Sequence, residues 1–119
     1  MSDDIIVTTM NDLPGYEIVE VYGEVFGLIV RARNAFSNIG AGLRTIVGGE
    51  ARGYTKLLAD SRAEALERLK DAADERGANA VIAMRFDCSE IGDIMSEVAA
   101  YGTAVRVVRK GAALTPAVP

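Results

Sequence analysis

Alternating apolar and polar positions from residue 16 to residue 33 predict a long β-strand early in the chain. Its apolar odd positions are Val19, Val21, Val25 and Ile29. From Phe26 to Val30 the even positions are apolar as well. An antiparallel sheet with one solvated face shows apolar side chains on one side only. We therefore expect this part of the strand to be covered on both faces, one by the chain's own helices and the other by a second copy.

Gly23 and Gly27 interrupt this strand. They predict either bulges or the close approach of another backbone, with simple bends as the alternative. Before them, the β-branched run from Ile5 to Thr9 predicts a short strand that ends in a turn. After them, residues 80–89 and 97–109 predict two more strands joined by a polar connection.

Two helices are predicted between these pairs of strands. The first begins at Asn34 or Ser37 and ends at Gly48, because apolar residues recur there at spacings of three and four. The second covers about residues 52–76 and stops at Gly77, a residue suited to the left-handed position after a helix. Its expected core-facing residues are Leu58, Ala65, Leu66, Leu69 and Ala73. The order β-β-α-α-β-β predicts an α+β domain with an antiparallel or mixed sheet and its helices on one side.

Composition narrows the class of protein. The chain has 119 residues, with 13 Lys and Arg against 17 Asp and Glu. We expect a single domain over residues 1–110 with a flexible tail over residues 111–119. The net charge of −4 disfavours nucleic acid and anionic membranes as partners. A single Cys and an acidic N-terminus without a signal peptide predict a cytoplasmic protein.

Candidate metal ligands are few, because the chain has no His and one Cys. Asp87 is a hard donor, Cys88 a soft one and Glu50 a third candidate. Cys88 follows apolar residues in strand phase, so a small buried side chain is its first interpretation. A symmetric ring would repeat each donor around its axis, and a divalent heavy metal is the cofactor such a site would take.

Three residues are candidates for binding a small ligand. Arg44 and Tyr54 lie near the corner between the two predicted helices, and Arg85 lies on the third predicted strand. Arg85 is two residues from Asp87, so a structural ion pair is the simpler interpretation of both. The chain has no His, the residue that usually serves as the base beside a catalytic Ser or Cys nucleophile. We therefore expect that the protein is not an enzyme. The alternative is an enzyme at a subunit interface, where Tyr54 or Tyr101 acts with an Arg on a small anionic substrate.

Five blocks of the sequence follow one another between about residues 5 and 108. They are Ile6-Val7-Thr8-Thr9, Leu13-Pro14-Gly15-Tyr16-Glu17-Ile18, Gly42-Leu43-Arg44-Thr45-Ile46-Val47-Gly48-Gly49-Glu50, Gly77-Ala78-Asn79-Ala80-Val81 and Ala100-Tyr101-Gly102-Thr103-Ala104-Val105. Together they resemble the YbjQ-like family of small bacterial and archaeal proteins. The resemblance implies an α+β protomer that assembles into a homopentameric ring, and a family described as "putative heavy-metal-binding". Arg85-Phe86-Asp87 also match a family block, from which Cys88 departs.

These observations predict a non-enzymatic cytoplasmic homo-oligomer that binds a heavy metal or small ligand at a site shared between subunits. A scaffold that docks other proteins is a third interpretation, and it predicts an exposed apolar patch on the outside of the ring.

Overall fold

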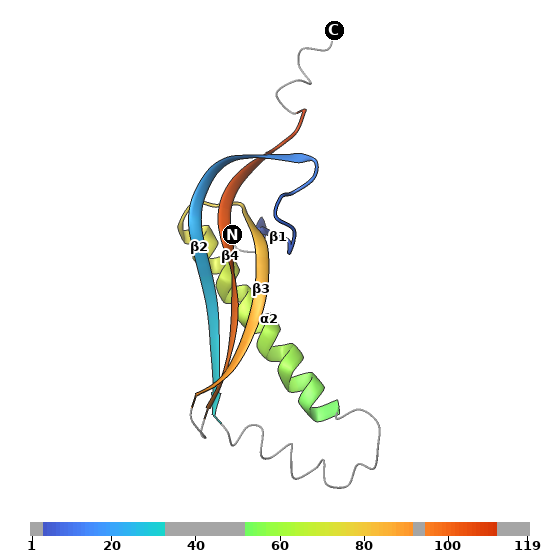
Figure 1. The fold of residues 1–119 in the computed structure, drawn as a ribbon, viewed down its shortest axis with the longest axis vertical. Coiled ribbons are helices and arrows are strands. Elements are labelled where there is room, and N and C mark those ends of the chain that lie inside the picture. The colour runs from blue at the N-terminus through green and yellow to red at the C-terminus, as the bar shows by residue number, and fades with distance from the viewer. Residues whose placement is uncertain (1–3, 33–51, 92–94, 112–119) are drawn as a thin grey trace.

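The computed structural model describes residues 4–32, 52–91 and 95–111. Its elements are β1 (Ile6–Val7), β2 (Tyr16–Ala32), α2 (Arg52–Glu75), β3 (Ala80–Ile91) and β4 (Met95–Arg109). The α+β class, the four predicted strands and the second predicted helix are confirmed (Figure 1). The first predicted helix and the tail beyond Gly111 lie outside the described residues.

The four strands form one mixed sheet in the order β1-β3-β4-β2. β1 is parallel to β3, whereas β4 is antiparallel to both β3 and β2. The first two strands along the chain therefore lie at opposite edges of the sheet. In Figure 1 the three long strands curve together and α2 crosses one face of the sheet diagonally.

Two bulges change the phase of β2. Its register with β4 shifts between Ile18 and Glu20 and again between Val21 and Gly23, and Gly23 has a φ of +100°. Each extra residue moves the following side chains to the other face. The register pairs Val21 with Val105 and Val25 with Gly102, which lie on opposite faces of the sheet. The prediction that Val21 shares a face with Val25 is therefore wrong, and Val21 is 64% exposed while Val25 is buried.

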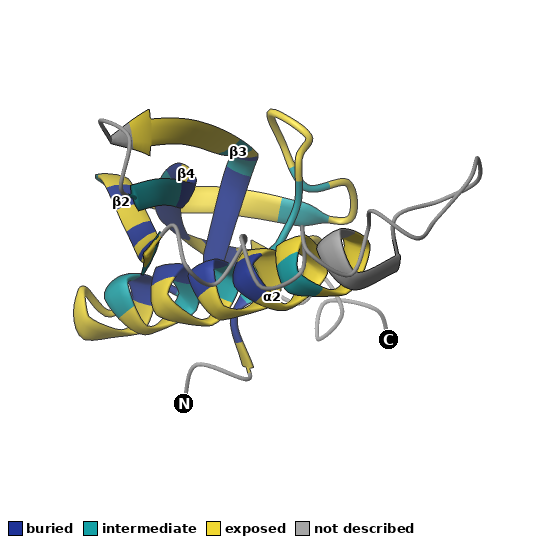
Figure 2. Cartoon of the chain, turned by 90° about the horizontal axis from the view of Figure 1, so that it is seen from below, coloured by how far each residue is buried: buried dark blue, intermediate teal, exposed yellow. Residues whose placement is uncertain are grey.

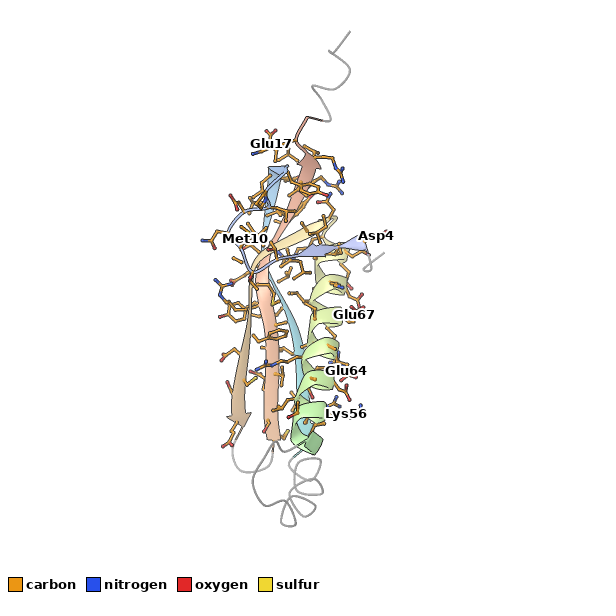
Figure 3. The ribbon with its side chains drawn as sticks, turned by 90° about the vertical axis from the view of Figure 1, so that its right-hand side faces the viewer. Asp4, Met10, Glu17, Lys56, Glu64 and Glu67 are labelled. Carbon is orange, nitrogen blue, oxygen red and sulfur yellow. The ribbon has the colours of Figure 1, made fainter. Side chains whose placement is uncertain are left out.

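α2 packs directly on β2 and β4. Its side chains Ala65, Leu69 and Ala73 are fully buried, as predicted. Figure 2 shows these buried positions on the side of the helix that faces the sheet. Leu58 was expected in the core but is 38% exposed, since it lies near the beginning of the helix, away from the buried cluster. The outer side of the helix carries charged residues, among them Lys56, Glu64 and Glu67 (Figure 3).

The end of α2 follows from the glycine that the sequence places there. Gly77 has a φ of +83°, in the left-handed region. Its N–H donates to the Asp74 carbonyl, and the N–H of Ala78 donates to the Ala73 carbonyl. This pair of bonds is the Schellman motif, which satisfies two of the last carbonyls of a helix. The predicted stop at Gly77 is confirmed.

β3 contains a bulge of its own. The register with β4 shifts between Ile82 and Arg85, and Ala83 has a φ of 54°, the one positive φ of a non-glycine residue in the described ranges. The bulge places Ile82 and Arg85 on the same side of the sheet. Met84 lies on the other side, in the core beneath α2.

The sheet face opposite α2 is covered over only part of its length. At one end Ile6, Leu13 and Tyr16 pack on a buried cluster of four residues, which are Ala80, Ile82, Val105 and Val107. The chain from β1 to the start of β2 therefore tiles that end. At the other end, beyond the β3 bulge, no described segment covers this face, and its apolar side chains are exposed.

Candidate functional site

The uncovered part of the sheet carries a column of large apolar side chains. Phe26, Leu28 and Val30 of β2 point to this face and are 50%, 43% and 48% exposed. Tyr101 of β4 is the register partner of Phe26, and their ring centroids are 6.1 Å apart. We call these four residues the apolar column. Isolated exposed apolar residues are ordinary, but contiguous ones mark interaction sites.

The same face is polar on the β3 side. Arg85 is the register partner of Tyr101, Asp87 of Ala99 and Ser89 of Glu97. Arg85 does not form the predicted ion pair with Asp87 in the described part of the chain. Its Nη1 group donates instead to the carbonyls of Thr9 and Met84, both at 2.8 Å. Arg85 thus caps the backbone where the pairing of the N-terminal segment with β3 ends.

Cys88 is exposed, so the prediction that it is a buried small side chain is wrong. It shares the strand phase of Met84 and Phe86, but α2 does not extend its core contacts this far along β3. Cys88 lines an open pocket of about 160 Å³ between the first half of α2, the end of β3 and the beginning of β4. The lining residues are Leu58, Cys88, Ser89, Glu90, Ser96, Glu97 and Val98.

Asp87 and Cys88 are neighbours in sequence but cannot hold one ion together. Successive side chains of a strand point to opposite faces, and Asp87 lies on the face of the apolar column whereas Cys88 lies on the face of α2. Among the described residues no group of three or more Cys, Asp or Glu side chains is placed to hold a metal ion. A complete metal site that uses either residue therefore needs donors from outside this part of one chain.

The other predicted site residues lie beyond the described side chains. Glu50 and Arg44 fall in residues 33–51, outside the described ranges. Tyr54 belongs to α2, but its side chain is also outside the description. The structure thus brings together Arg85 and Asp87 on one face, separates Cys88 from them, and leaves the remaining three candidates untested.

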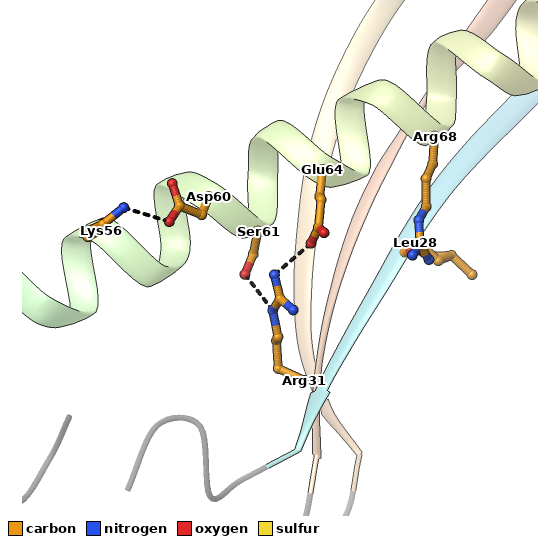
Figure 4. Close-up of polar contacts among 7 residues, drawn as sticks. All are labelled: Leu28, Arg31, Lys56, Asp60, Ser61, Glu64 and Arg68. Atoms are coloured by element: carbon orange, nitrogen blue, oxygen red, sulfur yellow. Dashed lines mark hydrogen bonds and ion pairs between the residues drawn. The ribbon is translucent and has the colours of Figure 1, made fainter. Parts of the chain in front are cut away.

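A polar cluster that sequence reasoning missed joins the end of β2 to α2 (Figure 4). Arg31 Nε donates to the fully buried Ser61 hydroxyl at 3.2 Å. Arg31 Nη2 lies 2.6 Å from Glu64 Oε2. Arg31 and Glu64 are 33 residues apart in the chain, so no local sequence pattern predicts their contact.

Two more arginines of this region reach the backbone of β2. Arg68 Nη1 donates to the Leu28 carbonyl at 2.7 Å, a contact visible in Figure 4. Arg76 Nη1 donates to the Tyr22 carbonyl at 2.9 Å. The charged side of α2 is therefore not only a solvated surface, because some of its members hold the edge strand.

The fold and its surfaces define a small α+β domain with one curled mixed sheet, a helix on one face and an uncovered apolar column on the other. No helix in the described ranges has the length and apolar character needed to span a membrane. A family model described as "Putative heavy-metal-binding" matches residues 5–108. The chain belongs to this YbjQ-like family, which confirms the resemblance inferred from the sequence blocks.

Relatives from bacteria and archaea match almost the whole chain. A UPF0145 protein of Streptomyces coelicolor is 57% identical over 106 residues, which cover 89% of this chain and all of that protein. One from Acidothermus cellulolyticus is 55% identical, with 88% and 97% covered, and one from Thermoplasma volcanium is 52% identical, with 87% and 85% covered. A crystal structure of a DUF74-family protein of unknown function from Pediococcus pentosaceus has the same fold, with a TM-score of 0.54 and 19% identity over 87% of this chain and 98% of that one.

Proposed function

We propose that this protein is a homo-oligomeric binding protein whose copies associate through the apolar column. The observation that carries the proposal is the exposure of Phe26, Leu28, Val30 and Tyr101 on one contiguous face. Together they present apolar surface on the order of 300 Å², comparable to the largest patch of a typical monomer, a patch that is often functional. A ring of five copies is the form that the family resemblance implies, and it is part of this proposal.

The column suits a second copy better than solvent for an energetic reason. Removing apolar surface from water contributes about 25 cal/mol per Å². The column is also preorganised, because its side chains stand on the paired strands β2 and β4 and need little ordering on association. Both features favour a stable contact between copies.

The ligand half of the proposal concerns a heavy metal held by donors from more than one copy. Cys88 offers a soft sulfur donor in an open pocket. The described part of one chain adds too few donors to complete the site. Symmetry multiplies each donor around an axis, so neighbouring copies are the source of the missing ligands. Asp87 and Glu50 are the candidate hard donors. Because Asp87 lies on the opposite face from Cys88, it would bind a different ion from the Cys88 of its own copy.

Binding without catalysis is proposed for this site. Arg85 was the candidate for recognising an anionic substrate, and it uses Nη1 to hold the carbonyls of Thr9 and Met84. A role in joining the N-terminal segment to β3 accounts for these contacts.

Light scattering tests the assembly. We expect a mass several times 12.6 kDa at micromolar concentration. Phe26→Asp places a charge in the column and is expected to dissociate the assembly. Val108→Asp is the matched control, because Val108 is comparably exposed at 44% but lies outside the column. A wild-type mass of 12.6 kDa would reject the proposed association.

Inductively coupled plasma analysis tests metal binding. Protein purified without a tag is challenged with Zn²⁺, Cu²⁺, Ni²⁺ or Cd²⁺ and then dialysed. We expect Cys88→Ser to lose the softer ions and Asp87→Asn to retain them, because the two side chains lie on opposite faces. Less than one tightly held ion per assembly in the wild type would contradict the metal half and leave the association standing.

A further inference from the structure

β2 is a long strand at the edge of the sheet. It has 17 residues, and among the described strands it pairs with β4 alone. An edge of this length presents a row of unpaired N–H and C=O groups, which is a template for the addition of another strand. An apolar column on the same strand increases the hazard, because an added strand would also bury apolar side chains.

Two arginines, Arg68 of α2 and Arg76 just after its end, close this edge at two points. Arg68 Nη1 donates to the Leu28 carbonyl at 2.7 Å, and Arg76 Nη1 donates to the Tyr22 carbonyl at 2.9 Å. Both bonds join residues 40 or more positions apart in the chain. Each occupies a carbonyl of the edge strand and places a guanidinium beside it. An incoming strand would have to displace a charged donor before it could pair there.

The close packing of helix and strand makes these bonds possible. Gly27 lies under α2, and a Cβ at this position would overlap with the Ala65 carbonyl oxygen and the Leu69 N–H. The helix axis therefore runs close to the edge strand. Arg68 lies within one helical turn of this contact, so its guanidinium can reach the backbone of β2.

Not every arginine of α2 reaches the backbone of β2. Arg62 of the same helix lies over the Phe86 ring of β3, 5.4 Å from its centroid. Arg62 therefore packs on a side chain, while Arg68 and Arg76 turn to the strand backbone. At the other edge, Arg85 caps the Thr9 and Met84 carbonyls where the pairing beside β3 ends.

We propose that Arg68 and Arg76 act as edge guards, which prevent strand addition at β2 and so direct association between copies to the sheet face. The proposal rests on the proposed association for its second part. A contact through the face can close into a finite assembly, whereas strand addition that pairs β2 with a different edge of the next copy is heterologous and can propagate.

The test replaces both arginines by methionine, which keeps an apolar stem and removes the donors. Arg68→Met/Arg76→Met is expected to raise the mean mass in light scattering several-fold above the wild-type value, to grow further with concentration and to bind thioflavin T. Arg62→Met is the matched control on the same helix and is expected to keep the wild-type mass. Arg68→Lys/Arg76→Lys retains a cationic donor at each position and is expected to polymerise less than the methionine variant.

Loss of stability is separated from loss of the guards by a second control. Ser61→Ala weakens the contact between α2 and β2 and leaves Arg68 and Arg76 in place. If Ser61→Ala lowers the melting temperature as much as the double methionine variant does, it should still not polymerise. If the double methionine variant does not fold, the single variants Arg68→Met and Arg76→Met are measured in its place.

A methionine variant that keeps the wild-type mass, or an Arg62→Met variant that polymerises equally, would overturn the proposal. The outcome is independent of the Phe26→Asp experiment. If the wild type is a monomer and its methionine variant polymerises, the role of Arg68 and Arg76 at the edge is supported. Only association through the sheet face is then rejected.

Discussion

Gly27 of β2 lies against the backbone of Ala65 in α2, and no side chain fits between them. A Cβ at Gly27 would overlap with the Ala65 carbonyl oxygen and the Leu69 N–H. Both obstacles are backbone atoms of a helix and cannot rotate away. This contact sets the distance between α2 and the edge strand, and with it the reach of Arg68 to the Leu28 carbonyl.

Gly27→Ala is expected to destabilise the protein by about 2–4 kcal/mol, because overpacking against backbone forces the helix away from the strand. Chemical denaturation measures the change in the free energy of unfolding. Glu24→Ala is the matched control, since Glu24 is exposed on the same strand and its loss should cost less than about 0.5 kcal/mol. Equal stability of the two variants would show that α2 does not approach β2 this closely.

Gly27 also shows which part of the fold the sequence predicts. A glycine within an apolar strand predicted close approach of another backbone, and that alternative is confirmed. The face to which Val21 points was not predictable in the same way. A bulge adds one residue through backbone geometry, and only Gly23 hinted at it. Because β2 has two bulges, the side chains between them, Val21 among these, lie on the face opposite to the one predicted.

The Arg31–Ser61 contact is expected to contribute measurably to stability. Ser61→Ala leaves the part-buried Arg31 Nε without the acceptor that the buried Ser61 hydroxyl provides, which should cost about 1–2 kcal/mol. Glu64→Gln should cost less than about 1 kcal/mol, because the Arg31–Glu64 ion pair is partly exposed and screened by solvent. Thermal unfolding of both variants at low and high salt measures the difference. A larger effect for Glu64→Gln would contradict this order.

The site was harder to predict than the fold because it depends on contacts that are distant in sequence. Cys88 has the strand phase of buried residues, but burial depends on where α2 begins, and the helix leaves the end of β3 uncovered. Arg85 was paired with Asp87 on spacing alone. In the structure Arg85 instead donates to the carbonyl of Thr9, which is 76 residues away in sequence. No local sequence pattern predicts the strand order that brings Thr9 beside Arg85.

Ala83 is a position where glycine should be tolerated or preferred. Its φ of 54° lies in the left-handed region, which costs an L-residue roughly 1–2 kcal/mol. Glycine removes that cost and loses about 0.5–1 kcal/mol of chain entropy. We therefore expect Ala83→Gly to change the free energy of unfolding by between zero and about +1.5 kcal/mol.

Ala100→Gly is the control for this prediction, because Ala100 is fully buried within the paired part of β4. Glycine there should destabilise the protein by about 1 kcal/mol. If Ala83→Gly destabilises as much as Ala100→Gly, the left-handed bulge in β3 is not the native conformation.

Asn79 closes the edge of β4 at the point where β3 begins. Its Nδ2 donates to the Val107 carbonyl at 2.9 Å, and its Oδ1 accepts from the Val107 N–H at 2.8 Å. The side chain thus replaces one residue of a neighbouring strand. Val107 is 2% exposed, so water cannot easily take over these bonds.

Asn79→Ala is therefore expected to destabilise the protein by about 2–4 kcal/mol, since it leaves a buried N–H and C=O unpaired together. Asn79→Asp keeps the acceptor and loses the donor, so its effect should fall between the alanine variant and the wild type. Hydrogen exchange gives a second readout, because the Val107 amide should lose protection in Asn79→Ala and keep part of it in Asn79→Asp. Equal protection of that amide in both variants would show that another acceptor holds it, and that the edge of β4 does not depend on Asn79.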